Sequence, residues 1–208
     1  MRHVPSTWSA ETAGMKRLVT TMAALVLAGA VSAEPVQITR DMPQATVQTL
    51  DGPAVIGRIQ DNDNRISGEW ALTSRACPPF CVQPMTPVPG VTTIGELELI
   101  AMLQDPEAVV VDSRVAADHA TGTIPGAISI PYNEAADRLD ALGCEIDFDG
   151  FDCAAAKPVA LFCNGPWCGQ SPTAARRMVE AGYPAERIFY YRGGMQVWRM
   201  LGLTVSGG

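Results

Sequence analysis

The stretch that decides the fold, residues 158–182, reads PVALFCNGPWCGQSPTAARRMVEAG. Residues 158–162 are all apolar, which is typical of a strand buried on both faces of a sheet. Ser171 and Pro172 then predict the start of a helix, because a hydroxyl can cap the first turn and proline fits the first helical position. The sequence thus predicts that Cys163 directly follows a buried strand and shortly precedes a helix.

Strand and helix patterns also alternate on both sides of this stretch, from residue 91 onward. Such alternation is typical of a parallel sheet covered by helices, because parallel strands need crossover connections that are usually helical. We therefore predict an α/β fold for residues 91–208, with an open parallel β-sheet flanked by helices. The further expected strands are 109–111, 128–130 and 187–191, and the further expected helices are 94–103, 134–142 and 195–201.

Residues 34–90 form an N-terminal extension that is rich in turn-forming residues and has no helical period. Ala45–Leu50 and Pro53–Gln60 flank an Asp-Gly pair, which predicts a small β-hairpin. Further along, the segment Cys77-Pro-Pro-Phe-Cys81 cannot be helical for long, because proline lacks a backbone donor and clashes with the preceding turn.

The first 33 residues have the character of a secretory signal. Two basic residues after Met15 precede an apolar run over 18–30, and small residues lead up to Ala33. We interpret residues 1–14 as an upstream extension and expect cleavage after Ala33. The mature chain would then keep no membrane span, and the protein would be periplasmic or secreted.

The composition excludes several function classes. The chain has 208 residues, 47% of them hydrophobic and 18% charged, so it is long enough to form a sizeable core. Its net charge of −7 argues against nucleic-acid binding, which needs clustered Lys and Arg to neutralise phosphates. Two histidines are too few for a His-rich metal site, so neither a metal nor another cofactor is expected. Cysteine must carry any nucleophilic chemistry.

Six cysteines fall in three close pairs, and an even number of cysteines in an exported protein predicts disulfides. We expect a stabilising bridge between Cys144 and Cys153, and a second bridge between Cys77 and Cys81 that fixes the extension. An alternative for Cys77 and Cys81 is handling of Cu(I), with Met85 as a thioether ligand.

The loop after Cys163 contains the candidate site. Its glycines let backbone amides turn inward around the sulfur, and the N-terminus of the next helix adds positive potential. Both effects favour the thiolate, which is the nucleophilic form. We expect this sulfur to be ionised and reachable from solvent, and Trp167 to gate it or to dock a partner. The candidate loop residues are Asn164, Gly165, Trp167, Cys168, Gly169, Gln170 and Ser171.

Four separated motifs resemble those of the rhodanese-like domain. They are Val109–Arg114, Gly122–Pro131, Leu161–Cys163 and Tyr191–Gly202, with Thr123 in the place of the family's usual histidine. The resemblance runs from about Thr93 to Val205. It implies a sulfurtransferase without a cofactor, in which Cys163 takes sulfane sulfur from a small donor as a persulfide and passes it to a thiol or protein acceptor.

Three departures from the family pattern bear on the chemistry. Residues 164–170 contain no Lys or Arg, which disfavours thiosulfate as the donor. Gly169 stands where related phosphatases and arsenate reductases have arginine, which disfavours oxyanion hydrolysis. Cys168 could resolve a persulfide or sulfenate by forming an intraloop disulfide with Cys163, or the two could form a permanent bridge. With all six cysteines bridged, the domain would instead be a non-catalytic binding module.

Overall fold

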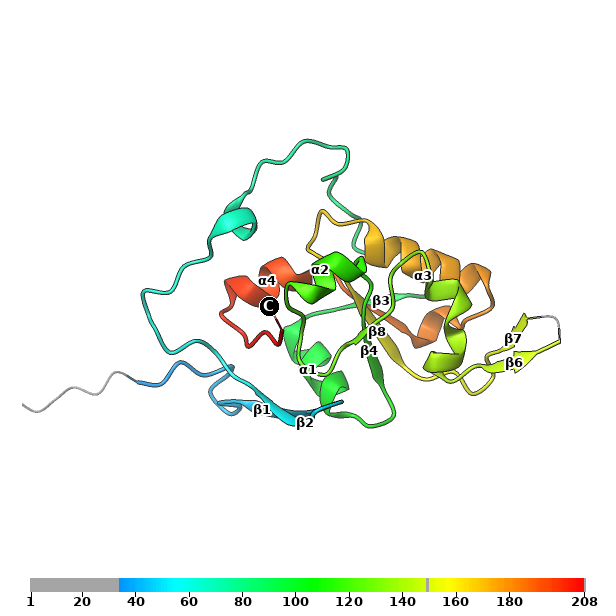
Figure 1. Cartoon of the computed structure of the whole chain (residues 1–208), viewed down its shortest axis with the longest axis horizontal. Helices are drawn as coiled ribbons and strands as arrows, with labels where there is room; N and C mark the ends of the chain where they lie inside the picture. The colour runs from blue at the N-terminus through cyan, green and yellow to red at the C-terminus, as the bar shows by residue number, and fades with distance from the viewer. Residues whose placement is uncertain (1–33, 149, 208) are drawn as a thin grey trace, which may run out of the picture. The chain divides into compact units, whose positions relative to one another are not determined.

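The computed structural model describes residues 34–148 and 150–207 and contains a five-stranded parallel sheet (Figure 1). The predicted signal peptide, residues 1–33, lies outside the described residues. The strand order is β3-β9-β8-β4-β5, which confirms the predicted parallel sheet. The strands are β3 (Thr92–Ile94), β4 (Val109–Asp112), β5 (Ile128–Ser129), β8 (Val159–Phe162) and β9 (Ile188–Tyr191).

Strand β8 lies at the centre of the sheet, between β4 and β9. Ala160 pairs with Val110 of β4, and Leu161 pairs with Tyr190 of β9. All four residues of β8 are buried. A central strand with both faces covered has to be apolar throughout, which explains the unbroken apolar run in the sequence.

Helices cover both faces of this sheet, which confirms the predicted layering (Figure 1). Met178 of α3 packs into one hydrophobic cluster with Leu161, while Leu99 of α1 and Trp198 of α4 pack into a second cluster with Phe162. Leu161 and Phe162 contribute to different clusters because successive strand residues point to opposite faces. The helices are α1 (Glu96–Gln104), α2 (Ala116–Ala120), α3 (Gln170–Glu180) and α4 (Gly194–Met200).

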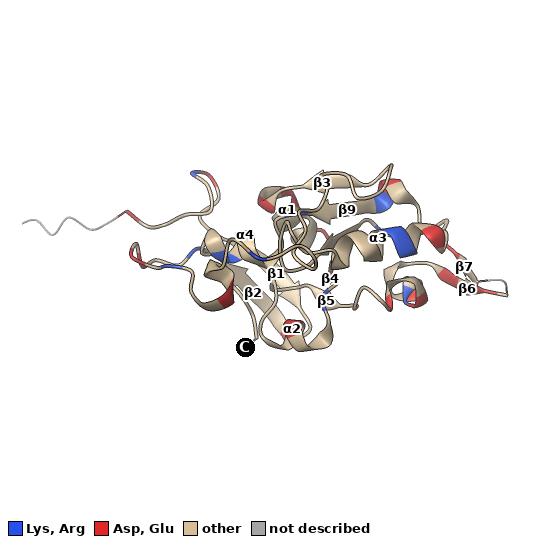
Figure 2. Ribbon diagram, turned by 90° about the horizontal axis from the view of Figure 1, so that it is seen from above, with Lys and Arg blue, Asp and Glu red and all other residues tan. Residues whose placement is uncertain are grey.

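The helix predicted over 134–142 is wrong. The chain instead forms two short 3-10 turns, η2 (Ala135–Asp137) and η3 (Leu139–Leu142), because Arg138 between them adopts φ −122° and ψ 27°, outside the helical region. The spacing of the buried residues fits a helix and two tight turns equally well. An unpredicted antiparallel hairpin of β6 (Glu145–Asp147) and β7 (Gly150–Asp152) follows, and its strands carry several of the acidic residues (Figure 2).

The helix predicted over 94–103 begins later than expected. Thr92, Thr93 and Ile94 pair with β9 as an edge strand, in keeping with the preference of β-branched residues for strands. At the start of α1 the backbone amide of Gly95 donates a hydrogen bond to Glu98 Oε2 at 3.0 Å. This is one half of a capping box, because glycine at the cap position has no side chain to accept the reciprocal bond.

The N-terminal extension forms the predicted hairpin, from β1 (Ala45–Thr49) and β2 (Gly52–Ile56). The second strand ends at Ile56 instead of Gln60. Val47 and Ile56 are buried in the same cluster as Leu99, so the hairpin packs onto the α1 side of the sheet. Further along the extension lies the 3-10 turn η1 (Gly68–Ala71), and η4 (Ala185–Arg187) precedes β9. Within the described part of the chain, no helix has the length and apolar character needed to cross a membrane.

Candidate active site

The Cys163 loop, residues 164–169, connects the end of β8 to the start of α3. Its shape is fixed by α4, because the backbone amides of Met195 and Gln196 donate to the carbonyl oxygens of Cys163 and Asn164, each at 2.9 Å. Gly194 makes this approach possible. A Cβ on Gly194 would clash with the carbonyl oxygen of Cys163, and its φ of +56° disfavours other residues.

The sulfur of Cys163 lies among several hydrogen-bond donors and one acceptor, the Cys168 carbonyl oxygen at 3.3 Å. Burial raises the pKa of Cys163, but hydrogen bonds from the Cys168 thiol, the Ser171 hydroxyl and the backbone amides of Ser171 and Gly165 outweigh burial and lower this pKa below its usual value. The Ser171 hydroxyl lies 3.0 Å from the sulfur. The expected arrangement of inward-facing amides is therefore present, and it favours the Cys163 thiolate.

Cys168 has the opposite character. Its hydrogen bond to Cys163, together with burial, raises the pKa of Cys168 far above its usual range. The two cysteines thus form an unequal pair, in which Cys168 keeps its proton, and its Sγ donates to Gln170 Oε1 at 3.6 Å. Both are free thiols in the structure, so the expectation of a permanent bridge between them is wrong.

The expectation that the Cys163 sulfur is reachable from solvent is also wrong. Cys163 is 2% exposed and Cys168 is 5% exposed. Part of the N-terminal extension lies against the loop, where the Gln83 amide donates to the Pro166 carbonyl at 2.8 Å. Sequence patterns gave no sign that residues so far upstream would pack here.

Trp167 does not present a free surface for a partner, contrary to one of its expected roles. Its ring makes an edge contact with Phe80 at 4.9 Å between centroids. The Arg75 guanidinium stacks on both rings, 4.7 Å from Phe80 and 4.9 Å from Trp167. The Trp167 indole NH also donates to Gln196 Oε1 of α4. The extension and α4 therefore hold Trp167 from two sides.

A buried ion pair between Asp112 and Arg114 supports the Cys163 loop through a contact with Asn164. Asp112 at the end of β4 binds Arg114 through Nε at 2.9 Å and Nη2 at 2.6 Å, and both side chains are fully buried. Arg114 Nη1 reaches Asn164 Oδ1 at 3.4 Å. Thr123 donates to Asp112 at 2.7 Å, and His119 Nδ1 lies 3.1 Å from the same carboxylate. Burial raises the pKa of Asp112, but the bonds and charge of Arg114 and the Thr123 hydroxyl lower it overall.

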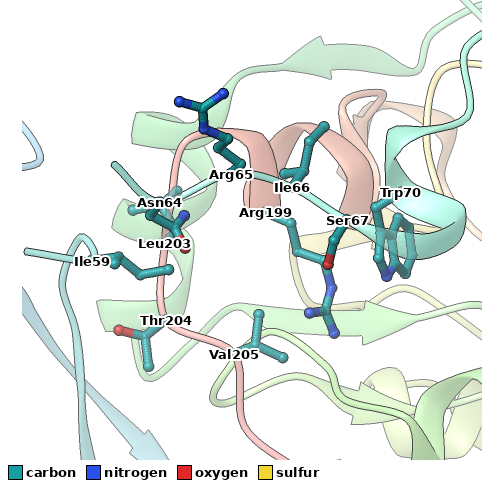
Figure 3. A pocket seen from close by; sticks show the side chains of 10 residues that line it. All are labelled: Ile59, Asn64, Arg65, Ile66, Ser67, Trp70, Arg199, Leu203, Thr204 and Val205. Carbon is teal, nitrogen blue, oxygen red and sulfur yellow. The ribbon is translucent and has the colours of Figure 1, made fainter. Parts of the chain in front are cut away.

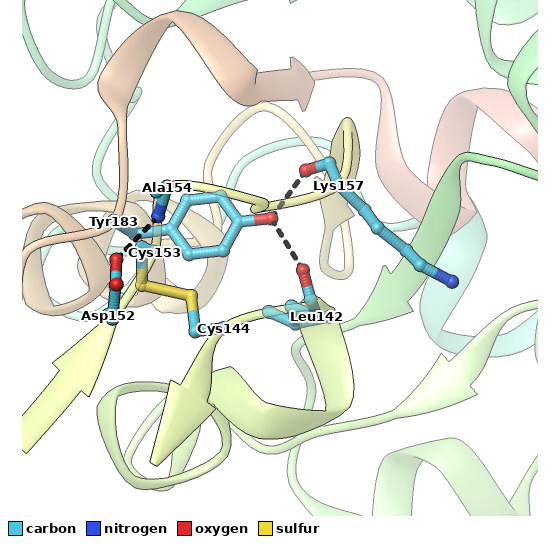
Figure 4. Close-up of a disulfide and its surroundings, with 7 residues drawn as sticks. All are labelled: Leu142, Cys144, Asp152, Cys153, Ala154, Lys157 and Tyr183. Carbon is cyan, nitrogen blue, oxygen red and sulfur yellow. Dashed lines mark hydrogen bonds between the residues drawn. A yellow bond between two sulfur atoms is a disulfide. The ribbon is translucent and has the colours of Figure 1, made fainter. Parts of the chain in front are cut away.

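The other four cysteines form two disulfides. Cys144 and Cys153 are bridged, as predicted, beside the β6–β7 hairpin (Figure 4). Cys77 and Cys81 are bridged as well, so the Cu(I) interpretation, which needs two thiolates, is wrong for this state. The alternative of a non-catalytic binding module assumed that all six cysteines are bridged. That assumption is wrong, since Cys163 and Cys168 are free.

Two pockets of similar size lie near this region. The first, about 250 Å³, is bounded by the extension, α4 and the C-terminal segment, and the Arg199 guanidinium stacks on Trp70 at its wall (Figure 3). No residue of the Cys163 loop lines it. The second, about 240 Å³, lies beside the loop and is lined by both Asn164 and Trp167. We call this second cavity the side pocket.

Several known proteins are similar to this chain in sequence or structure. The HTH-type transcriptional regulator Rv0324 of Mycobacterium tuberculosis is 34% identical over 115 residues, which are 55% of this chain and 45% of the regulator. This chain thus spans less than half of that relative's length. Among solved structures, the BH2092 protein of Bacillus halodurans is 26% identical with a TM-score of 0.45, covering 56% of this chain and 77% of its own.

The human single-domain sulfurtransferase TSTD1 is 24% identical with a TM-score of 0.39, covering 52% of this chain and 96% of its own. The family model of the rhodanese-like domain matches residues 96–201. That match is just over half of the sequence, and it includes the strand, the loop and the helices that build the site. The chain therefore belongs to the rhodanese-like domain family.

Proposed function

We propose that the protein is a sulfurtransferase that carries sulfane sulfur as a persulfide on Cys163. Membership of the family supports a sulfurtransferase-type function in general terms. The observation that favours Cys163 is its position at the end of β8, where the Ser171 hydroxyl lies 3.0 Å from the sulfur and the backbone amides of Ser171 and Gly165 also face it. Convergent donors of this kind stabilise negative charge on the sulfur in the thiolate and in the persulfide.

The reaction takes place in two displacement steps. The Cys163 thiolate attacks the sulfane sulfur of the donor, a new sulfur–sulfur bond forms, and the donor leaves with the electron pair of the broken bond. An acceptor nucleophile then attacks the outer sulfur of the persulfide, and the electron pair of the Cys163–sulfur bond returns to Cys163. Sulfur is transferred without net oxidation of the protein.

A second role is proposed for Cys168, as a resolving thiol. Its closeness to Cys163 supports this role, because Cys163 Sγ lies 3.3 Å from the Cys168 carbonyl oxygen and both thiols are free, and a neighbouring thiol can attack Cys163 in the persulfide state. The Cys163–Cys168 disulfide would then form and hydrosulfide would leave. The high pKa of Cys168 means that it must lose its proton before or during the attack, so this step is slow compared with transfer to an external thiol.

Export is part of the same proposal. The predicted signal at residues 1–33 favours it, and the bridges Cys77–Cys81 and Cys144–Cys153 are compatible with an oxidising compartment. In this interpretation two pairs are oxidised for structure, while Cys163 and Cys168 remain reduced for chemistry.

The decisive experiment is mass spectrometry of the protein after incubation with inorganic polysulfide. We expect a mass increase of one sulfur atom on the peptide that contains Cys163, and its loss on addition of cyanide as a sulfur acceptor. Cys163→Ser should show neither the adduct nor the transfer. Cys168→Ser should still form the adduct but release less hydrosulfide on standing. Full transfer by Cys163→Ser would refute the proposal.

A further inference from the structure

The cavity of about 250 Å³ between the extension, α4 and the C-terminal segment is called the Arg199 pocket here (Figure 3). Ile66 and Trp70 line it from the extension, Arg199 lines it from α4, and Leu203 and Val205 line it from the segment after that helix. Its volume lies below the roughly 300–1,000 Å³ of typical drug-sized sites. The cavity therefore suits a small molecule with apolar surface.

Arg199 is the cation of this cavity, and it has no partner in the part of the chain that the structure describes. Its side chain forms neither a hydrogen bond nor an ion pair there, and its Nε is buried without an acceptor. The guanidinium stacks on Trp70, 5.1 Å from the ring centroid. Partial burial of a cation without an acceptor costs free energy, and an anion at the terminal nitrogens would offset that cost.

The charges around Arg199 leave the cavity positive. Burial lowers the pKa of Arg199 most, the nearby Arg114 guanidinium lowers it further, and the Glu69 carboxylate raises it. Glu69 is largely exposed and lies 3.9 Å from Arg75 Nη2, so its charge is shared and screened. Arg65 also lines the cavity, but its guanidinium points away from it (Figure 3). No described Asp or Glu lines the cavity, so an anion would meet no carboxylate there.

The side pocket differs, because its cations already have partners. Arg114 lines the side pocket, but Asp112 binds its guanidinium at 2.6 Å. Arg75 lies beside Glu69, and both Glu69 and Asp118 line the side pocket. An anion would therefore meet two carboxylates in the side pocket. Of the two cavities, the Arg199 pocket is the one whose charge favours an anion.

We infer that the Arg199 pocket binds a small organic carboxylate with an apolar body. The carboxylate would accept hydrogen bonds from the Arg199 guanidinium, because a planar guanidinium matches the geometry of a carboxylate. Ser67 also lines the cavity and supplies a hydroxyl as a second donor. The apolar body would lie against Ile66, Trp70 and Leu203. The site is separate from the Cys163 loop, and its occupancy does not require sulfur transfer.

The test is a titration of the full-length protein with three probes, followed by the indole NH signals in NMR spectra. Benzoate carries both the carboxylate and an apolar body. Benzamide keeps the body without the charge, and acetate keeps the carboxylate without the body. Benzoate should bind about tenfold more tightly than either of the others, which is the scale of one charge-assisted hydrogen bond or of a buried apolar group.

Two tryptophans report where the probe binds. Trp70 lines both cavities, whereas Trp167 lines only the side pocket of the two. Benzoate should therefore shift the Trp70 indole signal in a saturable way and leave the Trp167 signal nearly unchanged. Because an occupant contacts the extension and the domain together, benzoate should also raise the temperature of thermal unfolding more than benzamide does.

Arg199→Gln should weaken benzoate binding by about tenfold and leave benzamide binding unchanged. Arg199→Lys keeps the charge without the planar guanidinium and should retain part of the affinity. Ser67→Ala should cause a smaller loss than Arg199→Gln. The matched control Arg176→Gln removes an exposed arginine of α3 and should change no affinity.

Equal affinities of the wild type for benzoate and benzamide would overturn the carboxylate site. So would the absence of saturable benzoate binding in the millimolar range, or unchanged benzoate affinity in Arg199→Gln. Equal shifts of the Trp70 and Trp167 signals would place the anion in the side pocket and overturn the assignment to Arg199. The comparison of the three probes uses wild-type protein, so it remains decisive if Arg199→Gln does not fold.

Discussion

Two buried cysteine pairs flank strand β8 in the sequence, and they are held in different chemical states. Cys144 and Cys153, 5% and 7% exposed, precede the strand and form a disulfide. Cys163 and Cys168, 2% and 5% exposed, follow the strand and are free. Burial and spacing along the chain are similar, so neither decides which pair is oxidised.

The difference lies in what holds each region together. Beside the β6–β7 hairpin, the Cys144–Cys153 disulfide links the two ends of the hairpin segment. The Tyr183 hydroxyl donates to the carbonyl oxygens of Leu142 and Lys157 (Figure 4). Beside the Cys163 loop the Asp112–Arg114 ion pair connects β4 to the loop. An ion pair can support a loop without consuming its thiols, which leaves the sulfur free to react.

The largest expected loss of stability follows from breaking the Asp112–Arg114 ion pair. Asp112→Asn leaves the buried Arg114 guanidinium without its counter-charge, so we expect the free energy of unfolding to fall by about 3–5 kcal/mol. Urea denaturation measures this free energy of unfolding. The exposed control Asp137→Asn should stay within about 0.5 kcal/mol of the wild type. An equal loss in the two variants would mean that the ion pair does not support the loop.

The same ion pair predicts the acid dependence of stability. The pKa of Asp112 is lower in the folded protein than in the unfolded chain, so its contribution is present above the ordinary carboxyl pKa of about 3.9 and is lost as the pH falls toward the folded value. Wild-type protein should therefore lose more unfolding free energy than Asp112→Asn between pH 5 and strongly acidic conditions. Parallel acid profiles would contradict this assignment.

Removing the hairpin disulfide has the next largest effect. A double substitution, Cys144→Ser with Cys153→Ser, should lower the free energy of unfolding by about 2–3 kcal/mol, since it frees a short closed loop in the unfolded chain. The alkylation rate of Cys163 by iodoacetamide should not change. A faster reaction at Cys163 in this variant would show that the two regions are coupled, and the comparison would fail.

Ser171→Ala should affect reactivity more than stability. It removes the hydroxyl that lies 3.0 Å from the Cys163 sulfur, so the pKa of Cys163 should rise. A hydrogen bond to a charged group contributes about 1.5–3 kcal/mol, so the alkylation rate near neutral pH should fall by about tenfold or more. The pH profile of alkylation should move to higher pH. Ser113→Ala, which changes a buried hydroxyl away from the sulfur, serves as the control.

The smallest effect concerns the attachment of the extension. Phe80→Ala removes an aromatic contact on Trp167 that contributes about 0.5–1.5 kcal/mol, so Cys163 should react a few-fold faster with a bulky maleimide. Val82→Ala changes an exposed side chain of the same segment and should leave the rate unchanged. Equal rates in the two variants would mean that the extension does not limit access.

Local chemistry made much of the fold predictable. The apolar run of β8 and the existence of α3 and of the first hairpin each follow from one short stretch of sequence. The details differ. Ser171 does not cap α3, because the helix already begins at Gln170 and the Ser171 hydroxyl bonds to the Cys163 sulfur instead. The hairpin turn is formed by Leu50 and Asp51, because Gly52 already pairs with Thr49. The turns over 135–142 were not predictable, because their buried residues have a spacing that a helix would share. The hairpin of β6 and β7 is short and mostly exposed, so it carries little hydrophobic signal.

The candidate site was predictable only where it is continuous in sequence. Cys163 directly precedes the loop and Ser171 lies in the first turn of α3, eight residues further on, so the two were identified together. Arg75 and Phe80 reach the site through tertiary packing of the extension, and Gln196 reaches it from α4. The closely spaced Cys77 and Cys81 were the only available signal, since a bridged turn is rigid enough to hold a neighbouring aromatic ring in place.

Gly194 shows that a residue can be indispensable without ever meeting a substrate. Any side chain there would push the start of α4 away from the carbonyl group of Cys163 and so distort the curve of backbone that receives the sulfur. A random mutagenesis screen for inactive clones would then recover position 194 alongside position 163. Position 194 would not tolerate substitution because of its backbone geometry, and position 163 because of its reactive sulfur. An activity measurement alone would not distinguish these two causes.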